Sequence, residues 1–79
     1  MQRYYFHTAD GGRDHDRDGA DLAGPDAARL EAIRYAGSVL THEPGQLREG
    51  FDFRVDVTDT GGALLFSIVA FVVDARNLR

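Results

Sequence analysis

The residues best suited to chemistry lie in one short acidic segment, Asp14-His15-Asp16-Arg17-Asp18-Gly19. Alternate carboxylates followed by glycine match the D-x-D-x-D-G spacing that opens a calcium-binding loop. In such a loop the carboxylate oxygens turn inward and the glycine permits a sharp bend. The segment therefore predicts a site for calcium or another hard cation on Asp14, Asp16 and Asp18. The alternative is a solvated acidic loop, because Pro25 stands at the twelfth position, where calcium loops carry a bidentate glutamate.

The three histidines, His7, His15 and His42, do not share a metal-ligand spacing. A transition-metal site would require His7 and His15 to meet across a hairpin, with an aspartate added. His42 falls at the expected end of a helix, where a positive charge complements the helix dipole. The histidines alone therefore do not predict a metal site.

Side chains suited to catalysis are scarce. The chain has no cysteine and no lysine, and neither of its two serines, Ser38 and Ser67, lies in a nucleophile motif. The paired carboxylates lie in a polar loop and not in a pocket whose burial could tune them. We therefore expect no enzymatic activity and no cofactor.

Charge and hydropathy exclude further classes of function. The net charge is −4, and the nine cationic residues, all arginines, are scattered along the chain, so no basic patch for nucleic acid is expected. The longest apolar run, Ala63 to Val73, is far shorter than the roughly 20 residues needed to span a bilayer. The opening Met1-Gln2-Arg3 does not begin a signal peptide. These features predict a cytoplasmic protein that binds neither membranes nor nucleic acid.

The clearest structural signal is strict alternation. Apolar Phe51, Phe53, Val55 and Val57 alternate with polar residues up to Thr58, which predicts a strand with one wet face. The segment Asp59-Thr60-Gly61-Gly62 predicts a hairpin turn, because its glycines can adopt positive φ.

Two further elements complete the expected domain. Residues 3–8 are aromatic and β-prone, which predicts a first strand, while a short second strand at 13–17 is left open. Pro25 begins an expected helix that reaches His42. Its apolar stripe consists of Ala28, Ala32, Ile33, Ala36, Val39 and Leu40. Glycine at position 37 disfavours the helix relative to alanine, so Gly37 is interpreted as the site of a close contact. Residues 1–79 are thus expected to form a single α+β domain, a three- to four-stranded antiparallel sheet with the helix on one face, in the order β-(β)-α-β-β.

The return strand, residues 63–73, is apolar on both of its faces. Alternation places Leu64, Phe66, Ile68, Ala70 and Val72 on one side, and Leu65, Val69, Phe71 and Val73 on the other. A single helix covers only one of these sides. Leu65, Val69, Phe71 and Val73 are therefore predicted to form an interface, and we expect a homodimer.

Several short motifs resemble a known family. The opening Met1-Gln2-Arg3-Tyr4-Tyr5-Phe6-His7, the Asp18-Gly19-Ala20-Asp21-Leu22 step and the Ala27-Ala28-Arg29-Leu30-Glu31-Ala32 helix start resemble short proteobacterial proteins that begin M-x-R-Y-[YF]-F-H. That family is classed as a domain of unknown function. The resemblance implies a small α+β domain and no activity, and it gives no support to a metal site, because Asp14 and Asp16 depart from the family pattern.

Three functions thus stay open for this chain. The first is a non-catalytic interaction or structural module that associates with itself. The second is a cation-binding module that uses the Asp14–Asp18 loop. The third is a small regulatory accessory protein that acts on a larger protein partner, an analogy that rests on size and fold alone.

Overall fold

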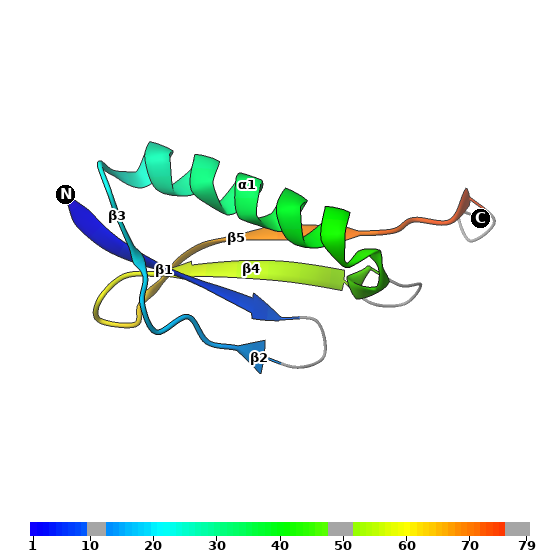
Figure 1. The fold of residues 1–79 in the computed structure, drawn as a ribbon, viewed down its shortest axis with the longest axis horizontal. Coiled ribbons are helices and arrows are strands. Elements are labelled where there is room, and N and C mark those ends of the chain that lie inside the picture. The colour runs from blue at the N-terminus through cyan, green and yellow to red at the C-terminus, as the bar shows by residue number, and fades with distance from the viewer. Residues whose placement is uncertain (10–12, 48–51, 76–79) are drawn as a thin grey trace.

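In the computed structural model, which describes residues 1–9, 13–47 and 52–75, one helix lies along one face of an antiparallel sheet (Figure 1). The strands are β1 (Gln2–Ala9), β2 (Arg13–Asp14), β3 (Ala20–Leu22), β4 (Asp52–Thr58) and β5 (Leu64–Phe71). The helix α1 spans Pro25–His42, and a 3-10 turn follows at Pro44–Gln46. The predicted α+β class, the helix boundaries and the element order are confirmed.

The strand order runs β2-β1-β4-β5, and β3 also pairs with β1. The central strand β1 pairs on one side with β4, with Tyr5 opposite Thr58 and His7 opposite Asp56. On its other side, β1 pairs with β3 at one end and with β2 at the other. The short polar strand that the sequence left open at 13–17 thus forms over two residues, and the sequence analysis missed β3 altogether.

The core forms where α1 crosses the sheet. Ala28, Ala32 and Ala36 are buried on the helix and meet a buried set on the strands, Tyr4, Phe53, Val55 and Val57. Alanine side chains are short, so the helix backbone lies close to the sheet and the larger strand residues fill the space between them. This arrangement confirms the predicted contact between the helix stripe and the alternating strand; Phe51, also assigned to that strand face, lies outside the described residues.

Two helix assignments need correction. Ile33 was predicted in the apolar stripe, yet its side chain is 51% exposed, because it lies about 100° around the helix from Ala32 and beyond the narrow alanine seam. Gly37 was interpreted as a close contact, but no atom lies within 4 Å of where its Cβ would be.

Within the described residues, none of the helical structure is long and apolar enough to cross a membrane.

The hairpin between β4 and β5 forms as predicted and contains an irregularity. Asp59 holds the turn, since its Oδ1 accepts hydrogen bonds from the Gly61 and Ala63 backbone N–H groups at 2.9 Å each. Gly62 adopts a φ of 83°, which favours glycine. The register then shifts between Val57 and Thr58, so that Thr58 faces Leu64 and Val57 faces Phe66.

Candidate functional site

The sheet face that α1 leaves uncovered carries the polar side chains of β1 and β4. Alternation along each strand places Tyr5 and His7 on this outer face beside Asp56 and Thr58. The hydroxyl of Ser67, on β5, donates to Asp56 Oδ1 at 2.6 Å. Arg54 Nε also donates to Asp56 Oδ1, at 2.9 Å, in an ion pair.

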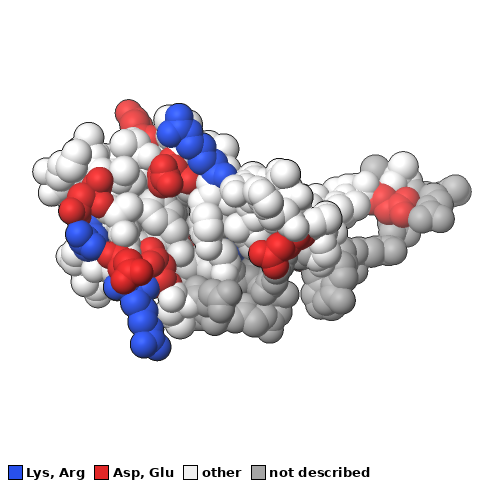
Figure 2. All heavy atoms as spheres, in the orientation of Figure 1, with Lys and Arg blue, Asp and Glu red and all other residues white. Residues whose placement is uncertain are grey.

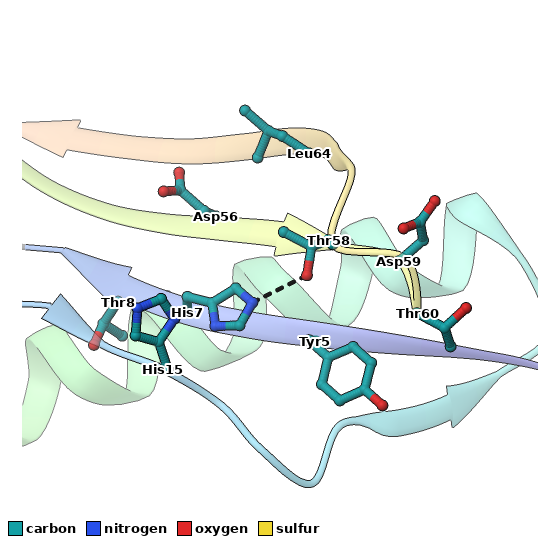
Figure 3. Close-up of a pocket in the computed structure, with 10 residues that line it drawn as sticks. Tyr5, His7, Thr8, His15, Asp56, Thr58, Asp59, Thr60 and Leu64 are labelled. Carbon is teal, nitrogen blue, oxygen red and sulfur yellow. Dashed lines mark hydrogen bonds between the residues drawn. The ribbon is translucent and has the colours of Figure 1, made fainter.

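His7 is held at both ring nitrogens. The Asp16 backbone N–H lies 3.0 Å from Nδ1, and Nε2 lies 3.0 Å from the Thr58 hydroxyl. A backbone N–H can only donate, so Nδ1 accepts the hydrogen bond and carries no proton. The remaining proton of the neutral ring is therefore on Nε2, where it is donated to Thr58 (Figure 3).

Asp16 ties the loop between β2 and β3 to β1. Its Oδ2 accepts from the Phe6 backbone N–H at 3.2 Å, and its Oδ1 accepts from the Asp18 and Gly19 N–H groups at 3.0 and 3.1 Å. Burial raises the pKa of the Asp16 carboxyl, but the hydrogen bonds from the Gly19, Phe6 and Asp18 backbone N–H groups outweigh it and hold that pKa below its ordinary value. The carboxylate thus occupies the place of the strand carbonyl that would otherwise pair with Phe6.

The predicted cation ligands do not form a common cluster among the described residues. Asp16 Oδ1 and Oδ2 are engaged by backbone donors, whereas Asp18 contributes its carbonyl oxygen to the Arg3 guanidinium. The Asp14 side chain lies outside the described part of the chain. Within that part, no three His, Cys, Asp or Glu residues are grouped so as to hold a metal ion. Cation binding by Asp14, Asp16 and Asp18 stays a prediction.

The histidines are placed in two regions. His7 and His15 do meet, in an edge-on contact with ring centroids 5.3 Å apart, although the pair is not joined by a third ligand in the described structure. His42 lies in the last turn of α1, as expected, with its Nδ1 2.8 Å from the Ser38 carbonyl oxygen. The meeting of His7 and His15 was considered from the sequence, but the hydrogen bonds that orient His7 were not.

The outer face also contains an open hollow of about 460 Å³ beside the β4–β5 turn. It is lined by Tyr5, His7, Thr8, His15, Asp56, Thr58, Asp59, Thr60, Gly62 and Leu64. Tyr5 and His7 form its floor, with rings nearly parallel at 10° (Figure 3). The sequence analysis missed this site, because its residues come from three strands, the β4–β5 turn and the loop after β2, and share no motif.

The predicted interface residues are exposed, but two neighbours exchange faces. Because of the register shift, Leu64 lies opposite Thr58 on the outer face, while Leu65 lines a hollow with Tyr4 and Pro25 on the helix side. The predicted side was therefore wrong for Leu64 and Leu65. Val69 lies opposite Arg54 and Phe71 opposite Asp52, on the uncovered face, and both are exposed, as is Val73 beyond the end of β5.

Comparison with known proteins relates the chain to a protein family. No curated protein and no solved structure shows a significant similarity to the chain. The model of a family described as a domain of unknown function (DUF6894) matches residues 3–71, a range that includes β1 from Arg3 onward, all of α1 and the complete β4–β5 hairpin. The description of the family names no activity, which is consistent with the expected membership of a domain-of-unknown-function family. Since the match extends over most of the length of the chain, this chain belongs to the DUF6894 family.

Proposed function

We propose that this protein is a non-catalytic interaction module that forms a homodimer through β5. The observation that carries the proposal is an apolar sheet edge. Strand β5 ends the strand order and, among the described residues, pairs only with β4. The edge exposes Leu64 and Phe71, each 62% exposed, together with Val69 between them and Val72 and Val73 beyond.

This edge lacks the features with which proteins usually keep sheet edges apart. Lysine, proline and inward-pointing charges are the common protective devices. Residues 63–73 contain no charged residue and no proline. The one register shift lies at the hairpin end and leaves Phe66–Phe71 regularly paired. A regular apolar edge of this kind favours addition of another strand.

A second copy of the chain is the occupant that fits best. Antiparallel pairing of β5 with itself about Ile68 would place Phe66 opposite Ala70 of the partner subunit and bring Leu64 and Leu65 beside Phe71 of the partner subunit. The exposed apolar residues at the two ends of the edge would then cover each other. Each copy carries a net charge of −4, so two copies repel in general, and an uncharged edge is where they can approach at the least electrostatic cost.

The exposed flank of α1 supports the same arrangement. Glu31 and Tyr35 line a hollow with Phe6 and Gly19, so their flank of the helix lies toward β1 and β3. Ile33 lies about 200° around the helix from both, on the flank toward β5. In a β5-paired dimer, two Ile33 side chains would approach each other above the joined sheet.

Sedimentation equilibrium at micromolar concentration tests the proposal. We expect the wild-type chain to sediment as a dimer and Val69→Lys as a monomer, because the substitution places like charges near each other across the joint. Leu30→Lys is the matched control: Leu30 is 49% exposed, close to the 48% of Val69, and lies on the helix side opposite Ala28. A monomeric wild type, or dimers in both variants, would refute the proposal.

A further inference from the structure

The hollow on the outer face has a flat aromatic floor. The Tyr5 and His7 rings are nearly parallel, with centroids 6.5 Å apart, as expected for two residues on the same face of one strand. Figure 3 shows both rings with their flat faces toward the viewer and α1 behind the sheet. The π-faces are therefore turned away from the core and toward the hollow, where a planar ligand could stack on them.

Both rings are held in place from the side. His7 is oriented by its bonds to Thr58 and to the Asp16 backbone N–H. Tyr5 rests against Gly19, because a Cβ built on Gly19 would lie only 2.9 Å from Tyr5 Cε2. A floor that is fixed before binding costs less entropy when a ligand stacks on it.

The charge around the floor is negative. Among the described residues that line the hollow, the charged side chains are Asp56 and Asp59, and none is lysine or arginine. Arg54 pairs with Asp56 from outside this lining, which leaves Asp59, at the turn, as the main source of negative potential. Figure 2, in the orientation of Figure 1, shows acidic and basic side chains interspersed on the face it draws, so the negative character of the hollow rests on its own lining residues. Phosphate-bearing ligands are therefore disfavoured here, and cations are favoured.

We propose that this hollow binds a small planar aromatic cation, which stacks on Tyr5 and His7 and is attracted by Asp59. The volume of the hollow, about 460 Å³, falls within the range of small-molecule sites. The hydroxyls of Tyr5, Thr58 and Thr60 line it as well and can accept hydrogen bonds from N–H groups on the ring substituent. The site is complete within one copy of the chain, so this inference does not depend on the dimer.

Three isosteric probes test the proposal by NMR titration: benzamidinium, benzamide and benzoate share one ring and differ in charge. We expect benzamidinium to bind with a dissociation constant on the order of 1 mM. Its binding should shift the resonances of Tyr5, His7 and Leu64. Benzamide should bind more weakly, and benzoate should give no shifts at about ten times that concentration. Equal binding of all three, shifts located elsewhere, or no shifts with benzamidinium would overturn the proposal.

Matched variants separate the contribution of ring stacking to benzamidinium binding from the contribution of charge. Tyr5→Leu should weaken benzamidinium binding by about two- to tenfold through loss of the aromatic face. Tyr35→Leu, on α1 and outside the lining of this hollow, should leave it unchanged. Asp59→Asn retains the side-chain oxygen that accepts from Gly61 and Ala63, and should weaken binding about threefold by removing the charge. Binding that is unchanged in both Tyr5→Leu and Asp59→Asn would refute the site, and benzamidinium binding to monomeric Val69→Lys would show that it is independent of dimerisation.

Discussion

The two long edges of this sheet are completed in different ways. Beyond β1, the chain folds back as β2 and β3, and the polar loop between them is held by Asp16, His7 and Arg3. Beyond β5, the described chain adds nothing, and apolar side chains are exposed. At the first edge, β1 pairs with β2 and β3 and its Phe6 N–H donates to Asp16, whereas the second edge exposes apolar side chains in the described part of the chain. The difference indicates that polar residues can close an edge within one chain, while an apolar edge favours association.

The largest expected effect is a loss of stability on substitution of Gly19, which lies at the edge that β2 and β3 complete. This residue has a φ of 70°, and an added Cβ would lie 2.9 Å from the Tyr4 carbonyl oxygen as well as from Tyr5. Gly19→Ala should therefore lower the free energy of unfolding by about 2–3 kcal/mol, measured by urea denaturation. Gly45→Ala is the control, because no atom lies within 4 Å of its Cβ position. Equal losses in the two variants would contradict a tight approach between the loop and β1.

The next largest effect is the loss of stability when Asp16 can no longer accept all of its backbone hydrogen bonds. Asp16→Asn should lower the free energy of unfolding by about 1–2 kcal/mol at neutral pH, because the amide offers only one accepting oxygen to the Phe6, Asp18 and Gly19 donors. Asp18→Asn should change it by less than about 0.5 kcal/mol, since the Asp18 side chain is exposed.

The same two variants, Asp16→Asn and Asp18→Asn, test the hypothesis that the acidic loop binds a cation. If Asp16 acts only as a structural acceptor, millimolar calcium will leave the wild-type melting temperature unchanged; a calcium-dependent rise that both variants abolish would instead establish a cation site.

The contribution of Asp16 should also depend on pH. Its pKa lies below the ordinary value of 3.8 in the folded chain, so the unfolded chain takes up a proton first as the pH falls. The stability that the carboxylate provides is then fully present above the unfolded pKa and is lost as the pH falls through the folded pKa. We expect the difference in unfolding free energy between wild type and Asp16→Asn to be constant from pH 7 to about pH 5 and to narrow below pH 4. A difference that widens in acid would exclude this linkage.

The smallest expected effect is a gain in stability far from both edges. Gly37 is exposed in the middle of α1 and no atom lies near its Cβ position. Gly37→Ala should raise the free energy of unfolding by about 0.5–1 kcal/mol, since alanine restricts the unfolded chain and favours the helix. Thermal melts of the variant and the wild type would measure it. A loss of stability would indicate that Gly37 makes a contact in solution, for example across a dimer interface.

Local patterns were sufficient to predict much of the fold. The alternation from Phe53 to Val57, the glycines of the β4–β5 turn and the proline at the start of α1 each act over a few residues, so their outcome can be deduced without knowledge of distant parts of the chain. The same approach failed at Leu64 and Leu65, because strict alternation cannot predict a register shift that depends on how the turn closes. It also failed at β3, whose three residues carry too weak a pattern to separate a strand from the start of the helix.

The candidate site shows the same division. The D-x-D-x-D-G spacing predicted a cation site on the acidic loop, but spacing alone cannot distinguish carboxylates that face a cation from carboxylates that face backbone N–H groups. The structure places Asp16 against β1, where Phe6, Asp18 and Gly19 are its donors. The hollow above Tyr5 and His7 had no sequence signal, because its residues are brought together only by pairing of β1 with β4.

By itself, the sequence determined where α1 and the long strands β1, β4 and β5 lie and which face of β4 is apolar, because these properties depend on neighbours one to four positions away. Only the tertiary structure decided that the acidic loop closes one edge of the sheet, that Leu64 and Leu65 exchange sides, and that β5 stands last in the strand order. Each of these outcomes depends on contacts between residues distant in the chain, whose geometry is set by packing and hydrogen bonding of the whole fold.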